Sequence, residues 1–288
     1  MEIKAAVLKA MDASSPYATS KPLTLETLEL DPPGPGEVLV RIKAAGLCHS
    51  DLSVINGNRP RPMPMALGHE AAGIVEEVGP VEGGIGGSDL EPGDHVVFVF
   101  VPSCGHCEPC TVGRPALCEP GAAANAAGTL LSGARRLHRS DGTPVNHHLG
   151  VSAFADYATV SRRSLVKVDN DLPLDEAALF GCAVLTGVGA VFNTARVPAG
   201  SSVAVIGLGG VGLSSLLGAV AAGARRIVAI DLSDEKLAFA RDLGATDTFN
   251  ARNPDAVAEV KAATGGGVEY AFELAGSTRA LDSAFQVT

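Results

Sequence analysis

The sequence has few basic residues, and this argues against nucleic acid as a binding partner. Its 22 Lys and Arg are outnumbered by 32 Asp and Glu, which gives a formal net charge of -10 at pH 7. Binding to a phosphate backbone requires a basic face. The chain also lacks internal repeats and low-complexity tracts, and 46% of its residues are hydrophobic, enough for a sizeable core. At roughly 100–200 residues per domain, the 288 residues predict two domains.

Neither an export signal nor a membrane span is expected. The first residues, MEIKAAVLKAMDASSPY, carry charges inside their apolar run and no cleavage-like segment. An uncharged stretch, 197–224, is long enough to cross a bilayer, but seven glycines interrupt it. It divides into a short β-branched run and a small-residue helix. We therefore expect a cytoplasmic protein with no membrane partner.

Six cysteines are too few for a disulfide scaffold in a chain of this length, and four of them are clustered. The stretch CGHCEPCTVGRPALC contains Cys104, Cys107, Cys110 and Cys118. A bacterial ferredoxin run would have three residues in the last gap and a following Pro, whereas here the gap is seven residues and Glu119 follows. Four thiolates would fill every position of a tetrahedral zinc ion. The lobe at about 100–120 is therefore predicted to hold a structural zinc and to do no chemistry.

The character of the chain changes near residue 180. Before it, short strand-like runs such as EVLVRIKAAGLC, AAGIVEEVG and PGDHVVFVFV alternate with Gly/Pro turns. GPVEGGIGGSDLEPGD predicts a Gly-rich loop, and residues 119–150 predict a long polar surface loop. After it, strands alternate with helices, which indicates a doubly wound parallel sheet. We predict a mainly-β domain at 1–180 and an α/β domain at 181–288.

A glycine-rich turn follows the first strand of the second domain. SSVAVIGLGGVGL places Gly207, Gly209 and Gly212 in a G-x-G-x-x-G pattern between a strand and a helix. These glycines allow a tight turn, the approach of a pyrophosphate and close packing of helix on strand. Asp231 ends the next strand, where a carboxylate bonds the ribose hydroxyls of NAD and repels the 2′-phosphate of NADP. Ser233 is the better candidate to cap the next helix, which leaves Asp231 for the ligand.

Two cysteines and one histidine remain to be explained. Cys48 lies in GLCHSD, His69 in GHEAAG and Cys182 in GCAVLTG, just before the nucleotide-binding unit. Together they would supply three zinc ligands and leave the fourth position open for water or substrate. Each residue alone also has an ordinary explanation, because a lone buried Cys is usually a small hydrophobe and a lone His a core residue.

Taken in order and at their separations, GLCHSD, GHEAAGIVEEVG, the four-cysteine lobe, GCAVLTGVGAV and VIGLGGVGL resemble a known family. The whole chain resembles the zinc-dependent medium-chain alcohol dehydrogenases. The resemblance implies a GroES-like catalytic domain followed by a Rossmann domain, with one catalytic and one structural zinc per chain. It implies reversible hydride transfer between an alcohol and NAD, with the catalytic zinc at Cys48, His69 and Cys182.

The resemblance also implies roles for further residues. Asp51 would orient His69, Glu70 would lie just behind the metal, and Ser50 would pass the alcohol proton outward. Phe100 would line the substrate pocket. Further cofactor contacts would come from the pyrophosphate-facing His49, the nicotinamide-facing Thr186, the loop residues Gly210 and Val211, and Lys236 beside Asp231.

The sequence departs from the family in two places. Many members have a His that completes the proton relay where this chain has Ser53, so the proton would leave through water or another route. Members also continue beyond SAFQVT with two more sheet strands, which carry the usual subunit contact. A further segment then returns to the first domain. The Rossmann domain is therefore expected to be C-terminally incomplete, in a fragment or a truncated relative, and the full-length protein is expected to be a homo-oligomer.

Three other interpretations stay open. The long segment at 119–150 is similar to that of a thiol-adduct formaldehyde dehydrogenase, the form with a deeper pocket. A shortened chain could instead be a non-catalytic protein that binds zinc or the cofactor. A membrane-associated or iron–sulfur redox protein is the least favoured.

Overall fold

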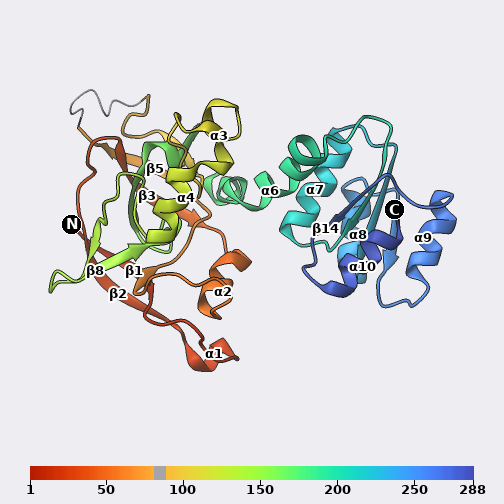
Figure 1. Cartoon of the computed structure of the whole chain (residues 1–288), viewed down its shortest axis with the longest axis horizontal. Coiled ribbons are helices and arrows are strands. Elements are labelled where there is room, and N and C mark those ends of the chain that lie inside the picture. The colour runs from red at the N-terminus through yellow and green to blue at the C-terminus, as the bar shows by residue number, and fades with distance from the viewer. Residues whose placement is uncertain (81–88) are drawn as a thin grey trace. The chain divides into compact units, whose positions relative to one another are not determined.

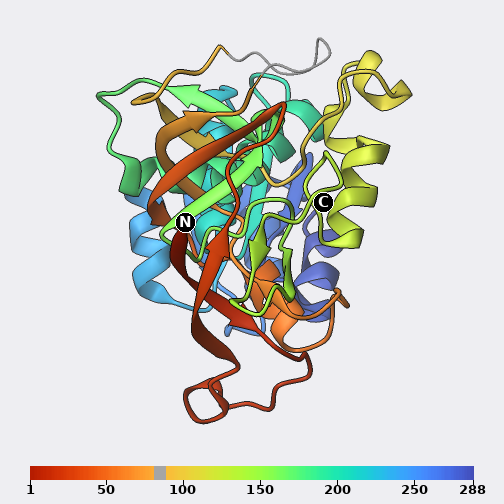
Figure 2. The same ribbon diagram turned by 90° about the vertical axis from the view of Figure 1, so that its left-hand side faces the viewer.

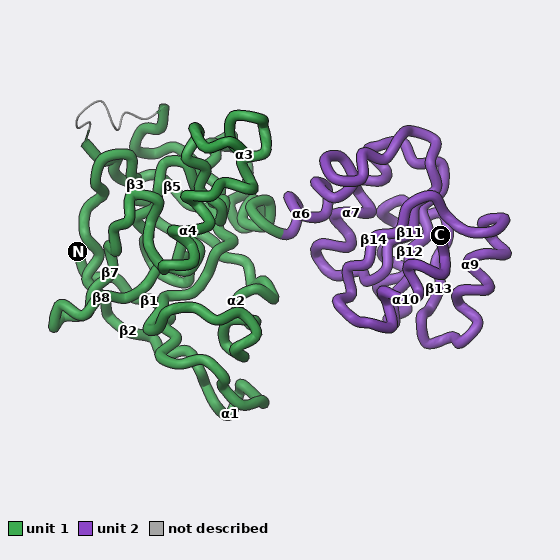
Figure 3. The backbone as a smooth tube through the Cα atoms, viewed as in Figure 1, with its two compact units in different colours: residues 1–182 green, residues 183–288 purple. Residues whose placement is uncertain are grey.

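The computed structural model describes residues 1–80 and 89–288, and the chain divides into two units, 1–182 and 183–288 (Figure 3). This division lies close to the predicted boundary after residue 180. The central part of the Gly-rich loop predicted at 79–94 lies outside the described residues.

The first unit contains two β-structures (Figure 1 and Figure 2). A closed barrel is formed, in spatial order, by β1 (Glu2–Leu8), β2 (Leu23–Leu30), β7 (Leu137–His138), β8 (Pro144–His147) and β4 (Met65–Ala66). A five-stranded sheet has the order β10 (Leu165–Val168), β6 (His95–Phe98), β5 (Ala71–Val78), β3 (Glu37–Ala45) and β9 (Tyr157–Ser161). The strands predicted from EVLVRIKAAGLC, AAGIVEEVG and PGDHVVFVFV are confirmed as β3, β5 and β6.

Short helices connect these strands. They are α1 (Tyr17–Ser20), α2 (His49–Ile55), α3 (Glu108–Thr111), α4 (Glu119–Ala127) and α5 (Leu174–Ala177), with 3-10 turns at Pro115–Leu117, Arg162–Ser164 and Ala178–Gly181. The core of the five-stranded sheet is aliphatic and aromatic, with Val38, Val40 and Phe98 fully buried. Because neighbours on a strand face opposite ways, Val38 and Val40 share one face of β3.

The prediction of a surface loop at 119–150 is wrong. This segment forms α4 and the barrel strands β7 and β8, and Leu130, Leu137 and Val145 are buried. The sequence EPGAAANAA has almost no polar–apolar contrast, so α4 shows no helical periodicity. The two strands contain only two and four residues, too few for alternation to be visible.

The second unit is a four-stranded parallel sheet covered by helices (Figure 1). Its order is β13 (Asp247–Asn250), β12 (Arg226–Asp231), β11 (Ser202–Ile206) and β14 (Tyr270–Glu273). The helices are α6 (Ala183–Gly189), which continues as a π-helix over Ala190–Ala195, α7 (Gly210–Ala221), α8 (Asp234–Asp242), α9 (Ala256–Thr264) and α10 (Thr278–Gln286).

Both faces of this sheet are buried. Val203 and Val205 of β11 pack in one hydrophobic cluster, whereas Ala204 and Ile206 pack in another. Successive residues of a strand point to opposite faces, so the sheet has a core on each side. The predicted doubly wound arrangement is therefore confirmed. The uncharged stretch at 197–224 forms β11 and α7 and not one continuous element.

Across residues 1–80 and 89–288, no single helix has the length and apolar character needed to span a bilayer. One bent pair of helices, Leu174–Gly181 with Ala183–Ala195, has the length and composition of a membrane span, and nothing else in the described part of the chain supports that role.

Candidate active site and metal centres

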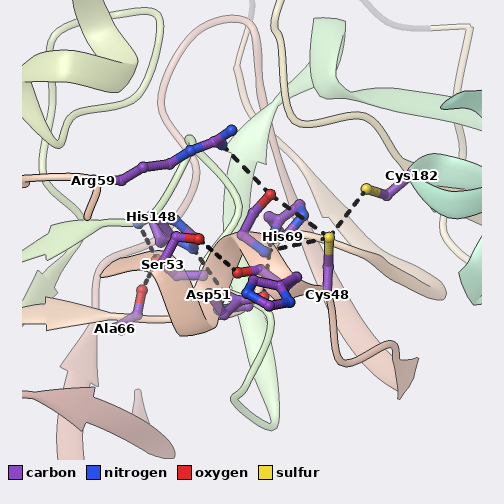
Figure 4. Close-up of polar contacts among 12 residues, drawn as sticks. Cys48, Asp51, Ser53, Arg59, Ala66, His69, His148 and Cys182 are labelled. Atoms are coloured by element: carbon purple, nitrogen blue, oxygen red, sulfur yellow. Dashed lines mark hydrogen bonds and ion pairs between the residues drawn. The ribbon is translucent and has the colours of Figure 1, made fainter. Parts of the chain in front are cut away.

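Cys48, His69 and Cys182 lie together within the first unit (Figure 4). Their ligand atoms are all within 4.8 Å of one another, and the two sulfur atoms are 3.7 Å apart. Two sulfurs bound to one tetrahedral zinc at about 2.3 Å would be separated by about 3.8 Å. The spacing of the trio therefore fits a shared zinc ion.

Local structure explains how residues from three distant segments meet. Cys48 is the N-cap of α2, and its sulfur accepts a hydrogen bond from the Ser50 backbone N–H at 3.5 Å. Cys182 follows the 3-10 turn that ends at Gly181. A Cβ at Gly181 would overlap the carbonyl oxygen of Phe98, so only glycine brings this turn so close to β6.

His69 lies between β4 and β5 and is oriented by Asp51. Its Nδ1 is 3.0 Å from one Asp51 carboxylate oxygen, which leaves Nε2 for the thiols. The other Asp51 oxygen is 3.0 Å from Nδ1 of His148 and accepts the Gly68 backbone N–H at 2.9 Å. The carboxylate and both rings are buried. A ligating imidazole oriented by a carboxylate is the usual arrangement around zinc.

The charges of these groups depend strongly on one another. Burial raises the pKa of Asp51, but His148 and His69 outweigh this effect and hold it well below its usual range. Burial lowers the pKa of His69, whereas Asp51 and Cys48 raise it to about 9. The Cys182 thiol and His69 lower the pKa of Cys48 to about 3. The Cys48 thiolate and burial in turn raise the pKa of Cys182.

One thiolate thus makes the second thiol hard to ionise. A divalent cation between the two sulfurs would stabilise both thiolates, because it supplies the charge that the site otherwise lacks. Two thiolates and one neutral imidazole are three ligands, so a tetrahedral metal keeps one position for another molecule. The donor set therefore fits a catalytic zinc.

Glu70 and Phe100 border the trio. Glu70 is buried and close enough to contribute to the raised pKa of Cys182. A Cβ at Gly46 would lie 2.8 Å from the Glu70 carboxyl carbon, so glycine leaves room for this side chain. The Phe100 ring meets the His69 ring edge-on, with centroids 5.5 Å apart. Both residues therefore lie beside the candidate zinc ligands, Phe100 against His69 and Glu70 near Cys182.

Two hydroxyl groups of α2 differ in their contacts. Ser50 Oγ lies 3.6 Å from Cys48 Sγ and accepts a hydrogen bond from Arg59 Nη1 at 3.5 Å. Ser53 Oγ donates to the backbone carbonyl of His49 at 3.0 Å, as expected for a helical serine. Ser50, and not Ser53, is therefore the hydroxyl beside the candidate zinc ligands.

The four-thiol lobe is a second candidate metal site. The sulfurs of Cys104, Cys107, Cys110 and Cys118 all lie within 4.8 Å of one another. Cys104 Sγ accepts the backbone N–H groups of His106 and Cys107, and these bonds lower its pKa to about 6. Burial and the neighbouring thiols raise the pKa of Cys110 to about 12. Four thiolates in such proximity need a dication, and zinc fills this role in closed sites made of four cysteines.

The glycine-rich loop borders a cavity of about 600 Å³ in the second unit, lined by Gly207, Gly209, Asp231 and Lys236 among others. Gly207 has φ +92, and a Cβ there would lie 2.5 Å from the Ala275 backbone N. A Cβ at Gly212 would overlap the Gly207 carbonyl oxygen, whereas Gly209 has nothing within 4 Å. Gly209 is the N-cap of α7 without a side-chain cap, so the first N–H groups of this helix are available to a phosphate.

Asp231 ends β12 as predicted, but its carboxylate already accepts two hydrogen bonds. It accepts the backbone N–H of Leu208 at 2.7 Å and of Ser233 at 3.0 Å. Ser233 does cap α8, accepting from the Lys236 N–H at 3.4 Å. Each carboxylate oxygen has a second lone pair, so Asp231 keeps acceptor capacity toward the cavity.

The remaining predicted cofactor residues lie in different places. Gly210 and Val211 begin α7, behind the glycine turn. His49 is exposed at the first position of α2. Thr186 is exposed on α6, directly before Gly187, where a Cβ would overlap the Val211 carbonyl oxygen of α7.

Comparison with known families agrees with this geometry. Residues 34–170 match the family described as "Alcohol dehydrogenase GroES-like domain", and residues 210–288 match "Zinc-binding dehydrogenase". The chain belongs to the zinc-dependent medium-chain alcohol dehydrogenases. Membership in this family implies that the protein binds zinc.

Solved structures of this family are similar over the whole chain. An alcohol dehydrogenase zinc-binding domain protein from Burkholderia ambifaria is 38% identical with a TM-score of 0.89, and the match covers 100% of this chain and 74% of that protein. The benzyl alcohol dehydrogenase of Acinetobacter calcoaceticus is 37% identical with a TM-score of 0.87 and the same coverage. A structure named NAD-dependent alcohol dehydrogenase is 31% identical with a TM-score of 0.76, and the match covers 99% and 74%.

Two residues beside the candidate zinc ligands were not predicted from the sequence. His148 shares the Asp51 carboxylate with His69, and the two rings meet edge-on at 5.5 Å. Arg59 reaches Ser50 from the segment after α2. The His147–His148 pair was a signal that could have been noticed, because two adjacent histidines in an apolar setting must find buried partners.

Replacing Asp51 with asparagine is expected to weaken zinc binding at the Cys48 site by about 10- to 100-fold, the usual loss when a partner of a zinc histidine is changed. The neutral amide keeps the shape of the side chain but loses the charge that both histidines contact. Competition against a chelator measures the affinity. Asp31→Asn is the matched control, because Asp31 faces His138 at 3.5 Å in a half-exposed pair. Equal zinc affinity in both variants would contradict the orienting role of Asp51.

Proposed function

We propose that the protein is an NAD-dependent zinc alcohol dehydrogenase that reversibly oxidises an alcohol to an aldehyde. The observation that carries this proposal is the Cys48–His69–Cys182 trio with three donor atoms and one position left over. The two units contribute different parts, since the trio lies within residues 1–182 and the glycine-rich cavity within residues 183–288.

When bound, the zinc supplies a Lewis acid that lowers the pKa of an alcohol and polarises a carbonyl. The side chains of this protein do the rest. Cys48, His69 and Cys182 hold the ion, and two thiolates balance its charge. Asp51, fixed by His148 and by the Gly68 N–H, keeps His69 in the orientation with Nε2 toward the thiols.

Ser50 is the residue that we assign to proton movement. Its hydroxyl is close to Cys48 and carries both a proton and lone pairs, so it accepts the alcohol proton and passes its own outward. Arg59, its hydrogen-bond donor, has no lone pair to receive that proton. Ser53 is engaged with the His49 carbonyl, so the onward route is through water.

NAD is the hydride acceptor in this proposal, and the second unit is suited to bind it. The α7 N-terminus offers uncapped N–H groups to the pyrophosphate. Asp231 and Lys236 border the cavity where the adenosine ribose would lie, and His49 and Thr186 stay as predicted contacts. A carboxylate at this position favours NAD over NADP.

Replacing Asp231 with alanine is expected to lower the affinity for NAD by about 10- to 100-fold, because hydrogen bonds to a charged group are worth about 1.5–3 kcal/mol. The affinity for NADP should fall less or rise, since a charge that repels its 2′-phosphate is removed. Cofactor titration measures both constants. Asp242→Asn, at the exposed end of α8 and outside the lining of the cavity, controls for the loss of one negative charge. Equal loss for both cofactors would remove Asp231 from the ribose site.

The test of the proposed function is NAD reduction by the zinc-loaded protein with a panel of primary alcohols. Benzyl alcohol belongs in the panel, because a benzyl alcohol dehydrogenase is 37% identical to this chain over the matched region. Oxidation that stops when zinc is removed and returns when it is restored would support the proposal. Zinc-loaded protein that reduces no cofactor with any alcohol would contradict it and favour the non-catalytic alternative.

A thiol-adduct formaldehyde dehydrogenase is the alternative, on the similarity of the segment 119–150, which forms α4 and two barrel strands in this structure.

A further inference from the structure

Two arginines beside the zinc site have no carboxylate partner in residues 1–80 and 89–288. Arg59 and Arg61 belong to the sequence NRPRPMP between α2 and β4. Neither forms an ion pair with any described carboxylate, and the Nε of Arg61 is buried without a hydrogen-bond partner. Arg41, Arg136, Arg139 and Arg162 of the same unit form ion pairs, whereas Arg114, Arg135 and Arg163 form none with a described carboxylate. Arg59 differs from these three because it contacts the hydroxyl beside the zinc ligands.

The Arg59 side chain extends to the hydroxyl beside the candidate zinc ligands. Its Nη1 donates to Ser50 Oγ at 3.5 Å, and Ser50 Oγ is 3.6 Å from Cys48 Sγ. The start of the side chain is fixed, because the Arg59 backbone N–H donates to the Ser53 carbonyl at 2.8 Å at the end of α2. A bond of 3.5 Å is long, so Ser50 uses little of the donor capacity of the guanidinium.

Arg61 adds positive charge near His148. Burial lowers the pKa of His148, and Arg61 is close enough to lower it further. His148 touches Asp51, which in turn holds His69. The Asp51 carboxylate is thus already used by the two histidines, and it forms no ion pair with either guanidinium. Two guanidiniums therefore lie around the zinc ligands without a carboxylate at ion-pair distance.

A guanidinium presents a planar set of donors that matches a carboxylate in two parallel hydrogen bonds. An unpaired one beside an alcohol site gives no advantage to an apolar substrate. It does stabilise a substrate that carries a carboxylate near its reacting carbon. Because the path from Arg59 through Ser50 to Cys48 is short, the carboxylate and the reacting carbon of such a substrate must be only a few bonds apart.

We propose that Arg59 binds a carboxylate of the substrate, so that the preferred substrates are hydroxy acids and the corresponding aldehyde acids. This inference rests on the proposed function and specifies its substrate class. Arg59 acts as a specificity-determining residue, and Arg61 supports it through long-range attraction.

The experiment compares matched substrates that differ only in the carboxylate. Butanol is paired with omega-hydroxybutyrate, and benzyl alcohol with meta-(hydroxymethyl)benzoate. The variants are Arg59→Gln, which removes the charge, and Arg59→Lys, which keeps it without the planar fork. Arg241→Gln is the control, since Arg241 is also exposed and lies at the end of α8, outside the cavity lining.

The wild-type protein should have a higher kcat/KM for the carboxylated member of each pair. Arg59→Gln should lower kcat/KM about 10- to 100-fold more for the acids than for the neutral alcohols, the usual loss of a charge-assisted bond; the part of the loss common to both members of a pair measures the hydrogen bond from Arg59 to Ser50. Arg59→Lys should be intermediate. Arg241→Gln should match the wild type with all four substrates.

Two results would overturn the inference while leaving the proposed function intact. One is oxidation of neutral alcohols without preference for the acids. The other is an equal loss for acids and alcohols in Arg59→Gln, with a raised KM for NAD, which would mean that the guanidinium serves a cofactor phosphate. If no substrate is turned over, calorimetric titration with omega-hydroxybutyrate shows whether the acid still binds. Arg59-dependent binding without turnover would refute the proposed function alone, whereas neither binding nor turnover would refute both.

Discussion

Replacing Cys182 with alanine is expected to remove one zinc per chain and to lower turnover at least about 1,000-fold. Loss of a Lewis acid costs several kcal/mol of transition-state stabilisation, and each 1.4 kcal/mol is about tenfold in rate. The remaining ligands, Cys48 and His69, are too few for tight binding. Zinc analysis and the rate of NAD reduction measure the two effects on the same sample.

The fold should survive this change, because Cys182 packs beside the sheet only through a small side chain. Circular dichroism and the zinc content of the lobe are the controls. A Cys182→Ala protein that still holds two zincs would place the ligand set elsewhere. One that fails to fold would mean that Cys182 has a structural role.

Replacing Cys118 with alanine is expected to unfold the lobe and to leave the zinc held by Cys48, His69 and Cys182 in place. Cys118 is fully buried, caps α4 and accepts the backbone N–H groups of Cys104 and Gly121. Structural zinc contributes on the order of 10 kcal/mol to local folding. We therefore expect the lobe at about 100–120 to unfold and become sensitive to proteases, with loss of one zinc.

The zinc held by Cys48, His69 and Cys182 should remain in Cys118→Ala. Activity should fall moderately, because Asn125 of α4 donates to the Phe100 carbonyl at 2.8 Å and Phe100 packs on His69. Thr111→Ala is the control for the lobe, since its hydroxyl bonds only the Glu108 carbonyl. Loss of both zincs in Cys118→Ala, or resistance of its lobe to proteases, would contradict the separation of the two sites.

The predictable parts of the fold are those in which the local geometry or chemistry accepts only one type of residue. Gly207 and Gly212 allow no Cβ at their positions, and four clustered thiols demand a cation. The central parallel strands of the second unit, β11 and β12, are continuous apolar runs, as expected when both faces of a sheet are buried. These signals are local, so the sequence displays them directly.

The parts that were missed depend on distant contacts or on weak periodicity. Asp51 and His148 are far apart in the sequence, and no local pattern marks this pair. Arg59 looks like an ordinary loop arginine until α2 turns it toward Ser50. The Ala-rich α4 and the very short β7 and β8 read as a loop because their burial comes from the barrel around them.

The zinc content of the wild-type chain tests the central claim most directly. All seven candidate ligands lie in the unit 1–182, so both sites should assemble whenever this unit folds. Elemental analysis of protein purified without chelator should therefore find two zinc ions per chain. No zinc in well-folded protein, or a single zinc that Cys182→Ala also retains, would contradict a catalytic zinc at Cys48, His69 and Cys182.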